Sequence, residues 1–420
     1  MSSVLVLADD FTGAMDTGHG FAARGCAVRV VVTDPKTDDT DRPSSSDADV
    51  FAVDLDSRDL EPTAAAAAVA SFLECGSVPE VVYKKIDSTL RGNVVREVDA
   101  ALEATGAKLA VVAPAFPGTG RVTVNGRHLV DGRPLENAGY GTDSDLPALF
   151  ESSEYDVATL SLETVLEGAD AVAAALADRG PDGPEIVVCD AVHDRHLEAI
   201  AAGARRCERE ALYVGSGGLA SAVSVPTSSR EPPSQTHEGE DALGIVGSVN
   251  GRTLEQLDAV PDDVLAELDP AAAVADPRET GREAATELES IRREHGRAVL
   301  TGATSRTDVD RASEAAAEHG VDAGERVARA LGVAAAEATR SAPPRGLLLT
   351  GGAIARAALE ELSASAIDLT GEAVVDGIPE GVIADGPAAG TPIVTKAGGF
   401  GDRRSIVNCL NFLDRVDEPE

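Results

Sequence analysis

Short apolar runs separated by helical or polar segments make up the hydrophobic pattern of this chain. Runs of Val, Leu, Ile and Ala without strict alternation are typical of strands buried on both faces of a parallel sheet. The pattern therefore predicts an α/β fold with largely parallel sheets. The predicted strands are Val4 to Ala8, Val28 to Val32, Val50 to Val53, Val81 to Tyr83, Ala110 to Ala113, Ile186 to Asp190, Leu212 to Val214, Leu243 to Val246 and Leu347 to Leu349.

Helical spacing of apolar residues fills most of the segments between these strands. The polar pair Asp131-Gly132 predicts the turn of a hairpin over Asn125 to Pro134. Prolines and glycines in Pro114 to Arg121 predict an irregular loop, and the arginine that closes it is a candidate for binding substrate oxygens. The predicted helices are Ala14 to Arg24, Thr63 to Leu73, Val94 to Leu102, Glu279 to His295 and Arg311 to Ala338.

The length of 420 residues and one polar stretch predict two domains. Thr227 to Asp241 is rich in polar residues and contains a proline pair, which is typical of a linker between domains. We therefore expect an N-terminal domain over residues 1–226 and a C-terminal domain over residues 242–420.

Composition excludes several classes of protein. The apolar runs fall short of the roughly 20 residues that span a membrane. Met1 to Asp10 reaches acidic residues without the basic start of a signal peptide. The five cysteines lie apart with no CxxC pair, which argues against a disulfide framework or a zinc site. We therefore expect a cytoplasmic protein.

The charge balance is strongly acidic. The chain has 72 Asp and Glu against 36 Lys and Arg, for a net charge of −36. Such a field repels nucleic acids and anionic membranes, so we expect neither as a partner. Carboxylates in excess with very few lysines suit a high-salt cytoplasm, and we hypothesise a halophilic protein. Because lysine is rare, Lys84, Lys85 and Lys396 are more informative where they occur in motifs.

The most informative stretch runs from Lys85 to Asn93, between a predicted strand and a predicted helix. In an open α/β sheet, ligands bind at this end of the strands. Ser88 and Thr89 can cap the helix, whose free N–H groups attract anions. Asp87 can accept a proton from a substrate hydroxyl, while Lys85 and Arg91 can hold a carboxylate or a phosphate. A capped helix with a surface ion pair is the structural alternative.

A second candidate site follows the first strand, where Asp9 and Asp10 precede Gly13 and a predicted helix. Two adjacent acids there can form a general base or a Mg²⁺ site. Helix capping would need only one of them, and the second acid favours a functional role. The segment Asp54 to Arg58 ends the third strand, where a ligand contact and a solvated loop are equally compatible with the sequence.

Two further motifs carry less weight. His193 and His196 have a spacing that can bind metal, but no third ligand accompanies them. Gly215 to Ala220 resembles a dinucleotide-binding turn after a strand, yet no ribose-binding acid follows at the usual distance. A tight turn that packs a helix against the sheet explains these glycines better.

Three turns of small residues follow strands in the C-terminal half. They are Gly247-Ser248, Gly351-Gly352 and the segment from Lys396 to Gly399. Glycines let backbone N–H groups approach a phosphate at the start of a helix. One such pair is usually structural, but three in one domain, one with a rare lysine, favour a nucleotide phosphate site. No lysine completes a P-loop motif.

Four segments together resemble the four-carbon acid sugar kinase family, in the right order and over the whole length. They read ADDFTGAMDTG, KIDSTLRGN, TGGAIARAAL and PIVTKAGGFGD. The resemblance implies ATP-dependent phosphorylation of acids such as threonate, erythronate or their oxo forms. It also implies an N-terminal substrate domain and a C-terminal nucleotide domain that face each other across a cleft. The chain departs from the family's frequent residues at Ala353, Ile354 and Gly399.

Carried over by position, the resemblance implies two sets of site residues. The catalytic candidates are Asp10, Asp87 and Arg91. The sugar-acid side is implied to include Asp9, Thr12, Gly13, Lys85, Ser88 and Thr89, to which the loop argument adds Arg121. The ATP side is implied to include Ser248, Gly351, Gly352, Lys396, Gly398 and Gly399, and we add Ala353 as a candidate beside the glycine pair.

The expected reaction uses ATP and Mg²⁺ and needs positioning and charge neutralisation more than covalent chemistry. We expect Arg91 and Lys85 to hold the substrate carboxylate, and either Asp10 or Asp87 to accept the proton of the attacking hydroxyl. The alternatives are an NAD(P)-dependent dehydrogenase that uses the Gly215 to Ala220 turn, and a sugar-acid sensor without catalysis. The sequence leaves the metal ligands and the oligomeric state open, a homo-oligomer included.

Overall fold

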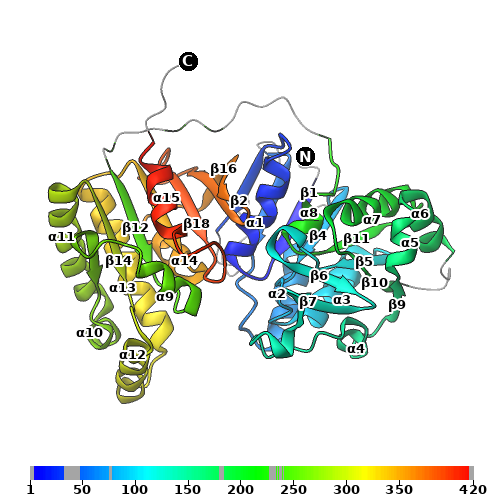
Figure 1. Cartoon of the computed structure of the whole chain (residues 1–420), viewed down its shortest axis with the longest axis horizontal. Helices are drawn as coiled ribbons and strands as arrows, with labels where there is room; N and C mark the ends of the chain where they lie inside the picture. The colour runs from blue at the N-terminus through cyan, green and yellow to red at the C-terminus, as the bar shows by residue number, and fades with distance from the viewer. Residues whose placement is uncertain are drawn as a thin grey trace. The chain divides into compact units, whose positions relative to one another are not determined.

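The computed structural model describes residues 4–32, 48–74, 78–178, 184–226, 233, 235, 239 and 241–415. The chain forms two compact units, Met1–Arg230 and Glu231–Glu420 (Figure 1). Most of the predicted linker from Thr227 to Asp241 lies outside the described residues. Within the described part of the chain, no helix is both long and apolar enough to cross a membrane.

The N-terminal unit is built on a parallel sheet in the order β2-β3-β1-β4-β11-β5-β10-β9. Apart from the edge strand β9, most residues of these strands are buried, which explains why they contain so few polar positions. The strands are β1 (Val4–Ala8), β2 (Val28–Val31), β3 (Val50–Asp54), β4 (Val81–Lys85), β5 (Leu109–Ala113), β9 (Asp156–Leu160), β10 (Glu185–Cys189) and β11 (Ala211–Gly215). The prediction of a largely parallel α/β sheet is confirmed.

The strand order of this unit reverses at β1. From β1 the chain continues through β2 and β3 on one side and then returns to place β4 on the other side. In open α/β sheets such a switch point opens a crevice at the carboxyl ends of the two strands. The helices of the unit are α1 (Phe11–Ala22), α2 (Pro62–Glu74), α3 (Val94–Thr105), α4 (Leu146–Phe150), α5 (Leu162–Leu166), α6 (Ala169–Ala177), α7 (Asp194–Arg206) and α8 (Gly217–Ala220).

A small antiparallel sheet, β6-β7-β8, follows β5. Its strands β7 (Arg127–Val130) and β8 (Arg133–Pro134) confirm the predicted hairpin, with the turn at Asp131-Gly132. The prediction of an irregular loop up to Arg121 is wrong for the second half of the segment, which forms regular structure. Pro117–Thr119 forms a 3-10 helix, and Arg121 begins strand β6 (Arg121–Val124), because this segment pairs with β7.

The C-terminal unit has a sheet in the order β13-β14-β12-β15-β18-β17-β16. It is parallel from β13 to β18, and β17 is antiparallel to both of its neighbours. The order reverses between β12 and β15, which creates a second switch point. The strands are β12 (Ala242–Val246), β13 (Leu265–Glu267), β14 (Arg297–Thr301), β15 (Gly346–Thr350), β16 (Ala366–Val375), β17 (Ile378–Ile383) and β18 (Pro392–Lys396).

The prediction of one helix from Arg311 to Ala338 is wrong, because this segment belongs to two helices. The chain breaks at Gly320, whose φ of 66° ends one helix, and Asp322 caps the next by accepting a hydrogen bond from the Glu325 N–H. The helices of this unit are α9 (Gly251–Leu257), α10 (Pro270–Ala275), α11 (Pro277–His295), α12 (Arg306–His319), α13 (Ala323–Ser341), α14 (Gly352–Glu361) and α15 (Ser405–Leu413).

Candidate active site

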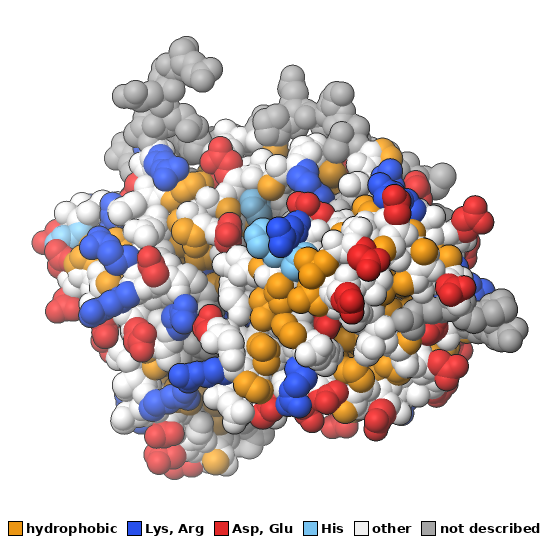
Figure 2. All heavy atoms as spheres, turned by 45° about the vertical axis from the view of Figure 1, so that its right-hand side comes forward, with side chains coloured by type: hydrophobic (Ala, Val, Ile, Leu, Met, Phe, Trp, Pro, Cys, Tyr) orange, Lys and Arg blue, Asp and Glu red, His pale blue; other side chains and the backbone are white. Residues whose placement is uncertain are grey.

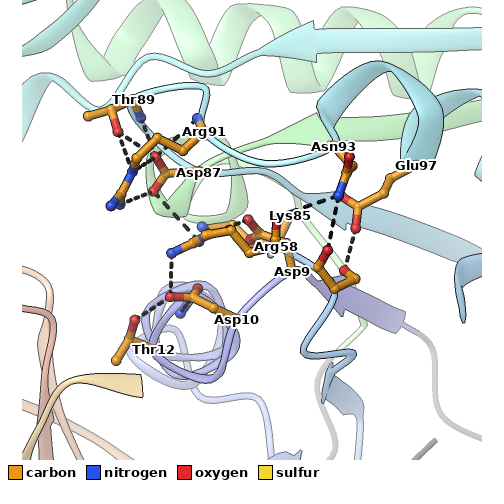
Figure 3. A network of polar contacts seen from close by, with 12 residues as sticks. Asp9, Asp10, Thr12, Arg58, Lys85, Asp87, Thr89, Arg91, Asn93 and Glu97 are labelled. Atoms are coloured by element: carbon orange, nitrogen blue, oxygen red, sulfur yellow. Dashed lines mark hydrogen bonds and ion pairs between the residues drawn. The ribbon is translucent and has the colours of Figure 1, made fainter. Parts of the chain in front are cut away.

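The first two predicted motifs meet at the switch point of the N-terminal unit. Ala8 at the end of β1 pairs in register with Lys85 at the end of β4. The acids that follow each strand therefore leave the sheet at the same edge. Figure 3 shows Asp9 and Asp10 from one turn and Asp87 from the other, on either side of an arginine.

That arginine is Arg58, which follows β3. Its Nε lies 2.7 Å from Asp9 Oδ2, its Nη1 lies 2.7 Å from Asp10 Oδ2, and its Nη2 lies 3.6 Å from Asp87 Oδ1 (Figure 3). Burial alone would lower the pKa of Arg58, but the three carboxylates raise it well above its usual value. For this residue the sequence is equally compatible with a ligand contact and with a solvated loop. The signal available was its place after a strand that neighbours β1.

Within the Lys85 to Asn93 segment, the Asp87 carboxylate accepts most of the side-chain hydrogen bonds. Its carboxylate accepts hydrogen bonds from the Thr89 N–H, the Thr89 hydroxyl and the guanidinium of Arg91, whose Nε and Nη2 lie 2.8 and 2.9 Å away. Burial would raise the pKa of Asp87, but Arg58, Arg91 and Lys85 together hold it far below its usual range. The group is therefore a firmly ionised carboxylate.

The expectation that Ser88 and Thr89 cap the following helix is wrong. The residue at the N-cap of α3 is Asn93, and no side chain caps the helix there. Thr89 instead turns its hydroxyl to Asp87, and a strained residue follows it, because Leu90 has a φ of 60°. This left-handed position lets the segment curl back so that Arg91 reaches Asp87.

Asp10 has a double role at the start of α1. It is the N-cap residue, and its Oδ1 accepts a hydrogen bond of 2.8 Å from the Gly13 N–H. Its Oδ2 accepts one of 2.8 Å from the Thr12 hydroxyl and also pairs with Arg58. Asp10 therefore caps the helix and also belongs to the charged cluster, and its role in catalysis stays a prediction.

Asp9 and Lys85 lie deeper in the same cluster. Asp9 is 2% exposed, and its Oδ1 makes no hydrogen bond within the described residues. Burial would raise the pKa of Asp9, but Arg58 and Lys85 lower it. Gly13 makes room for both strand ends, since a Cβ there would lie 2.5 Å from Asp10 Oδ1 and 2.9 Å from Lys85 Nζ. A side chain at this position would force Asp10 or Lys85 to move.

His128 of the small sheet and Thr142, which follows it in the chain, hold the carbonyl groups of Ser88 and Thr89. His128 Nε2 lies 3.0 Å from the Ser88 oxygen, and the Thr142 hydroxyl donates to the Thr89 oxygen at 2.7 Å. Burial lowers the pKa of His128 to about 4, so its ring is neutral at pH 7 and Nε2 carries the proton. Arg121 is buried beside this histidine and donates to the Thr119 carbonyl at 2.7 Å.

The second switch point gathers the small-residue turns of the C-terminal unit. A Cβ on Gly398 would lie 2.1 Å from Ser248 Oγ, and a Cβ on Gly351 would lie 3.6 Å from the Ser248 N–H nitrogen. Gly351 also donates its N–H to the Lys396 carbonyl at 3.0 Å. The turns after β12, β15 and β18 are therefore in direct contact, as expected for parallel strands that end at one edge.

Lys396 has a different place from the one expected. Its side chain is fully buried, and its ammonium donates to the carbonyls of Ala397 and Phe400 at 3.0 and 3.3 Å. Burial lowers its pKa to about 8. The lysine therefore holds the glycine loop from beneath and adds positive charge under it.

The remaining candidates of this unit present backbone groups. Gly352 and Ala353 are the first residues of α14, and no side chain caps that helix at Gly351, so its first N–H groups are available to an anion. Gly399 stands next to Gly398 in the loop, and a Cβ there would meet only Asn250 Nδ2 at 3.9 Å.

The weaker motifs have structural roles. His193 caps α7 and accepts from the Arg195 N–H, and no cluster of three or more His, Cys, Asp or Glu able to hold a metal occurs within the described ranges. Gly217 and Gly218 allow tight packing, because a Cβ on either would lie within 2.5 Å of Asp16 Oδ2 or the Ala115 oxygen. The interpretation of this turn as close helix packing fits these contacts.

Comparison with known proteins places these two units in one family. A family model described as the sugar-binding N-terminal domain matches residues 4–223, and one described as the nucleotide-binding C-terminal domain matches residues 243–406. This chain belongs to the four-carbon acid sugar kinase family.

Full-length relatives support the same assignment. The chain is 33% identical to a D-threonate kinase of Salmonella typhimurium, over 98% of this chain and 99% of the relative. It is 34% identical to a D-threonate kinase of Cupriavidus necator, over 99% of both. A D-erythronate kinase of Heliobacterium modesticaldum is 31% identical, over 98% of this chain and 97% of the relative.

The fold is also that of a solved protein. A crystal structure from Haemophilus influenzae superimposes with a TM-score of 0.69 at 20% identity, covering 97% of this chain and all of that chain. At this level of identity the likeness concerns the fold.

Proposed function

We propose that this protein transfers the γ-phosphoryl group of ATP to a hydroxyl of a four-carbon sugar acid, with threonate, erythronate and their oxo forms as the substrate class. The observation that carries the proposal is the cluster at the end of β1 and β4. There Arg58, Arg91 and Lys85 stand among Asp9, Asp10 and Asp87 at a switch point of the sugar-binding unit. Such a site offers both cations for a carboxylate and acids for a hydroxyl.

Arg91 and Lys85 are the groups we assign to the substrate carboxylate. Arg58 is engaged by three acids, whereas the side chain of Arg91 is 51% exposed and uses only one edge of its guanidinium on Asp87. The ammonium of Lys85 makes no hydrogen bond or ion pair within the described part of the chain, although its charge acts on Asp9 and Asp87. A planar guanidinium and a nearby ammonium together suit an anionic, hydroxyl-rich substrate.

Asp10 is the general base that the geometry favours over Asp87. Several donors of Thr89 and Arg91 occupy the Asp87 carboxylate and hold its pKa far below its usual range, which makes it a weak base. Asp10 lies at the outer side of the cluster with its side chain 20% exposed. We assign Asp87 to the positioning of Arg58 and Arg91.

The nucleotide is assigned to the C-terminal switch point. The N–H groups at Gly351-Gly352 and at Gly398-Gly399 are suited to bind phosphate oxygens, and Ser248 lies between them. The charge of Lys396 beneath the loop favours the same ligand. Mg²⁺ neutralises the phosphates of ATP when bound, and the lack of a carboxylate cage among the described residues fits an ion held mainly through phosphates.

We also propose a cytoplasmic, high-salt setting for this enzyme. The net charge is −36, and Figure 2 shows Asp and Glu side chains spread over the face in view, with Lys and Arg side chains between them. Four cysteines in the described residues are free and buried, which suits a reducing compartment. High salt screens the repulsion between this surface and its anionic substrates.

The decisive experiment measures ATP consumption in molar KCl with Mg²⁺ against threonate, erythronate, their oxo derivatives and longer aldonates. Turnover with one four-carbon acid and none with longer acids is the expected result. Binding of ATP without turnover on any four-carbon acid would reject the substrate class. Absence of ATP binding would reject the nucleotide assignment as well.

A further inference from the structure

A buried ion pair lies directly behind the charged cluster. The ammonium of Lys84 is 3.2 Å from Glu97 Oε2, and the two side chains are 0% and 1% exposed. Lys84 also donates to the carbonyls of Lys85 at 2.8 Å and Leu7 at 3.3 Å. The lysine therefore ties the end of β4 to the end of β1, the two strands that carry the cluster.

Stability alone does not account for this pair. Taking two charges out of water costs several kcal/mol per ion, and a well-packed apolar pair of similar volume is often equally stable or more so. The pair also occurs in a chain that contains few lysines. A role in holding specific groups in place explains its presence better.

The groups that Glu97 holds belong to the segment that carries Arg58. Glu97 accepts a hydrogen bond from the hydroxyl of Ser57, which is fully buried. One turn earlier on the same face of α3, Asn93 donates to the carbonyls of Ser57 at 3.2 Å and Leu60 at 2.8 Å. Asn93 and Glu97, four residues apart at the start of α3, therefore both form hydrogen bonds with the segment from Ser57 to Leu60.

Gly92 completes this contact. Its φ is 86°, and a Cβ there would lie 3.2 Å from Arg58 Cγ and 3.4 Å from the Arg58 oxygen. The last two residues of the KIDSTLRGN segment thus face the backbone and stem of Arg58. The contact with Arg58 therefore explains why glycine and asparagine occur at positions 92 and 93 without involving the substrate.

We propose that Lys84, Glu97 and Asn93 are positioning residues that place Arg58 among Asp9, Asp10 and Asp87 for the reaction. The inference rests on the proposed kinase function. The path runs from Lys84 through Glu97 to Ser57, and from there along one peptide unit to Arg58. Loss of this path displaces Arg58 and with it the acids that it orients.

The first test removes one hydroxyl. We expect Ser57→Ala to lower kcat/KM for the sugar acid by about 10- to 100-fold, the range typical when a supporting hydrogen bond or a small displacement disturbs a site. The KM for ATP should not change. The matched control is Ser153→Ala, which removes a serine hydrogen bond of 2.6 Å to Asp99 on the same helix, away from the cluster. The control should keep the wild-type kcat/KM.

The second test compares two double variants that both remove the buried charges. Lys84→Met with Glu97→Gln keeps an acceptor for Ser57, whereas Lys84→Met with Glu97→Leu does not. We expect the variant with Gln to exceed the variant with Leu by about tenfold or more in kcat/KM for the sugar acid, at a temperature where circular dichroism shows both folded. A purely structural pair would not separate them.

The outcomes separate the two proposals. Wild-type values for Ser57→Ala and equal values for the two double variants, with an active wild type, would overturn the inference alone. A wild-type enzyme that turns over no four-carbon acid would overturn the proposed function and this inference with it. If the variant with Leu does not fold, Ser57→Ala against Ser153→Ala decides the question.

Discussion

Three cations and three carboxylates form one compact cluster at the residue scale. Arg58 is surrounded by the acids, and Asp87 in turn is bound by Arg91. Because the charges compensate locally, the cluster itself adds no net negative charge where an anionic substrate would bind, although the chain as a whole carries −36. The exposed edge of Arg91 then adds attraction for a carboxylate.

The two candidate bases should respond differently to neutralisation. Asp10→Asn keeps the helix cap, because Asn caps as well as Asp, and should lower kcat by about 10²- to 10⁴-fold with little change in the KM for ATP. Asp87→Asn leaves Arg58 and Arg91 without their shared partner, so we expect it mainly to raise the KM for the sugar acid. Steady-state kinetics of both variants measure this difference, and near-normal kcat for Asp10→Asn would contradict the assignment.

From the lowered pKa of Lys396 we predict opposite effects of rising pH on activity and on stability. Its pKa is lowered from 10.5 to about 8 by burial, so the ammonium under the glycine loop is lost as pH rises through about 8. We therefore expect kcat/KM for ATP to fall above about pH 8. Between about pH 8 and 10.5 the unfolded chain still binds the proton that the folded chain releases, so this group makes folding more favourable as pH rises.

A pH profile of kcat/KM with ATP checks this, together with urea unfolding over the same range. Lys396→Met should start from a lower kcat/KM and lack the fall above about pH 8. The same fall in this variant would assign the titration to another group.

At the scale of elements, both candidate sites arise from strand ends that meet at a switch point. β1 and β4 bring together acids that lie far apart in the sequence, and β12, β15 and β18 do the same for three glycine turns. The close approach of Gly398 to Ser248 shows that the second site depends on backbone contact. A substitution that pushes these turns apart can therefore test whether their close contact is needed for the site.

Gly398→Ala should widen the contact between the turns after β12 and β18. Its Cβ would lie 2.1 Å from Ser248 Oγ, and forced displacement of this kind typically costs about 1–3 kcal/mol, or roughly 5- to 150-fold in the Kd for ATP. Gly251→Ala is the matched control, since a Cβ there meets nothing within 4 Å at the start of α9. Calorimetric titration with ATP would measure both, and unchanged binding for Gly398→Ala would argue against a nucleotide at this turn.

At the scale of the whole molecule, the acidic surface predicts a strong dependence on salt. With 36 more carboxylates than cations, self-repulsion opposes the compact state, and screening shortens from about 10 Å at 0.1 M to about 3 Å at 1 M salt. We expect the urea midpoint of unfolding to rise steadily as KCl increases from about 0.1 M into the molar range. A midpoint independent of KCl would refute the halophilic hypothesis.

The sequence by itself determined the fold class, most strands and the segments that form both candidate sites. Buried parallel strands require continuous apolar runs, and runs such as Val4 to Ala8 are visible without tertiary information. The segments after strand ends also stand out, because charged residues and glycines are rare inside such runs. The antiparallel strands β16 and β17 and the break at Gly320 were not foreseen.

Only the tertiary structure decided what the side chains contact. Arg58 follows a strand that neighbours β1 in the sheet, and no local pattern distinguishes it from a solvated loop residue. Lys396 was expected at the phosphates but is buried under its loop, and Thr89 binds Asp87 where a helix cap was expected. The reason is physical: strand order and register determine which residues meet, and they depend on the whole chain at once.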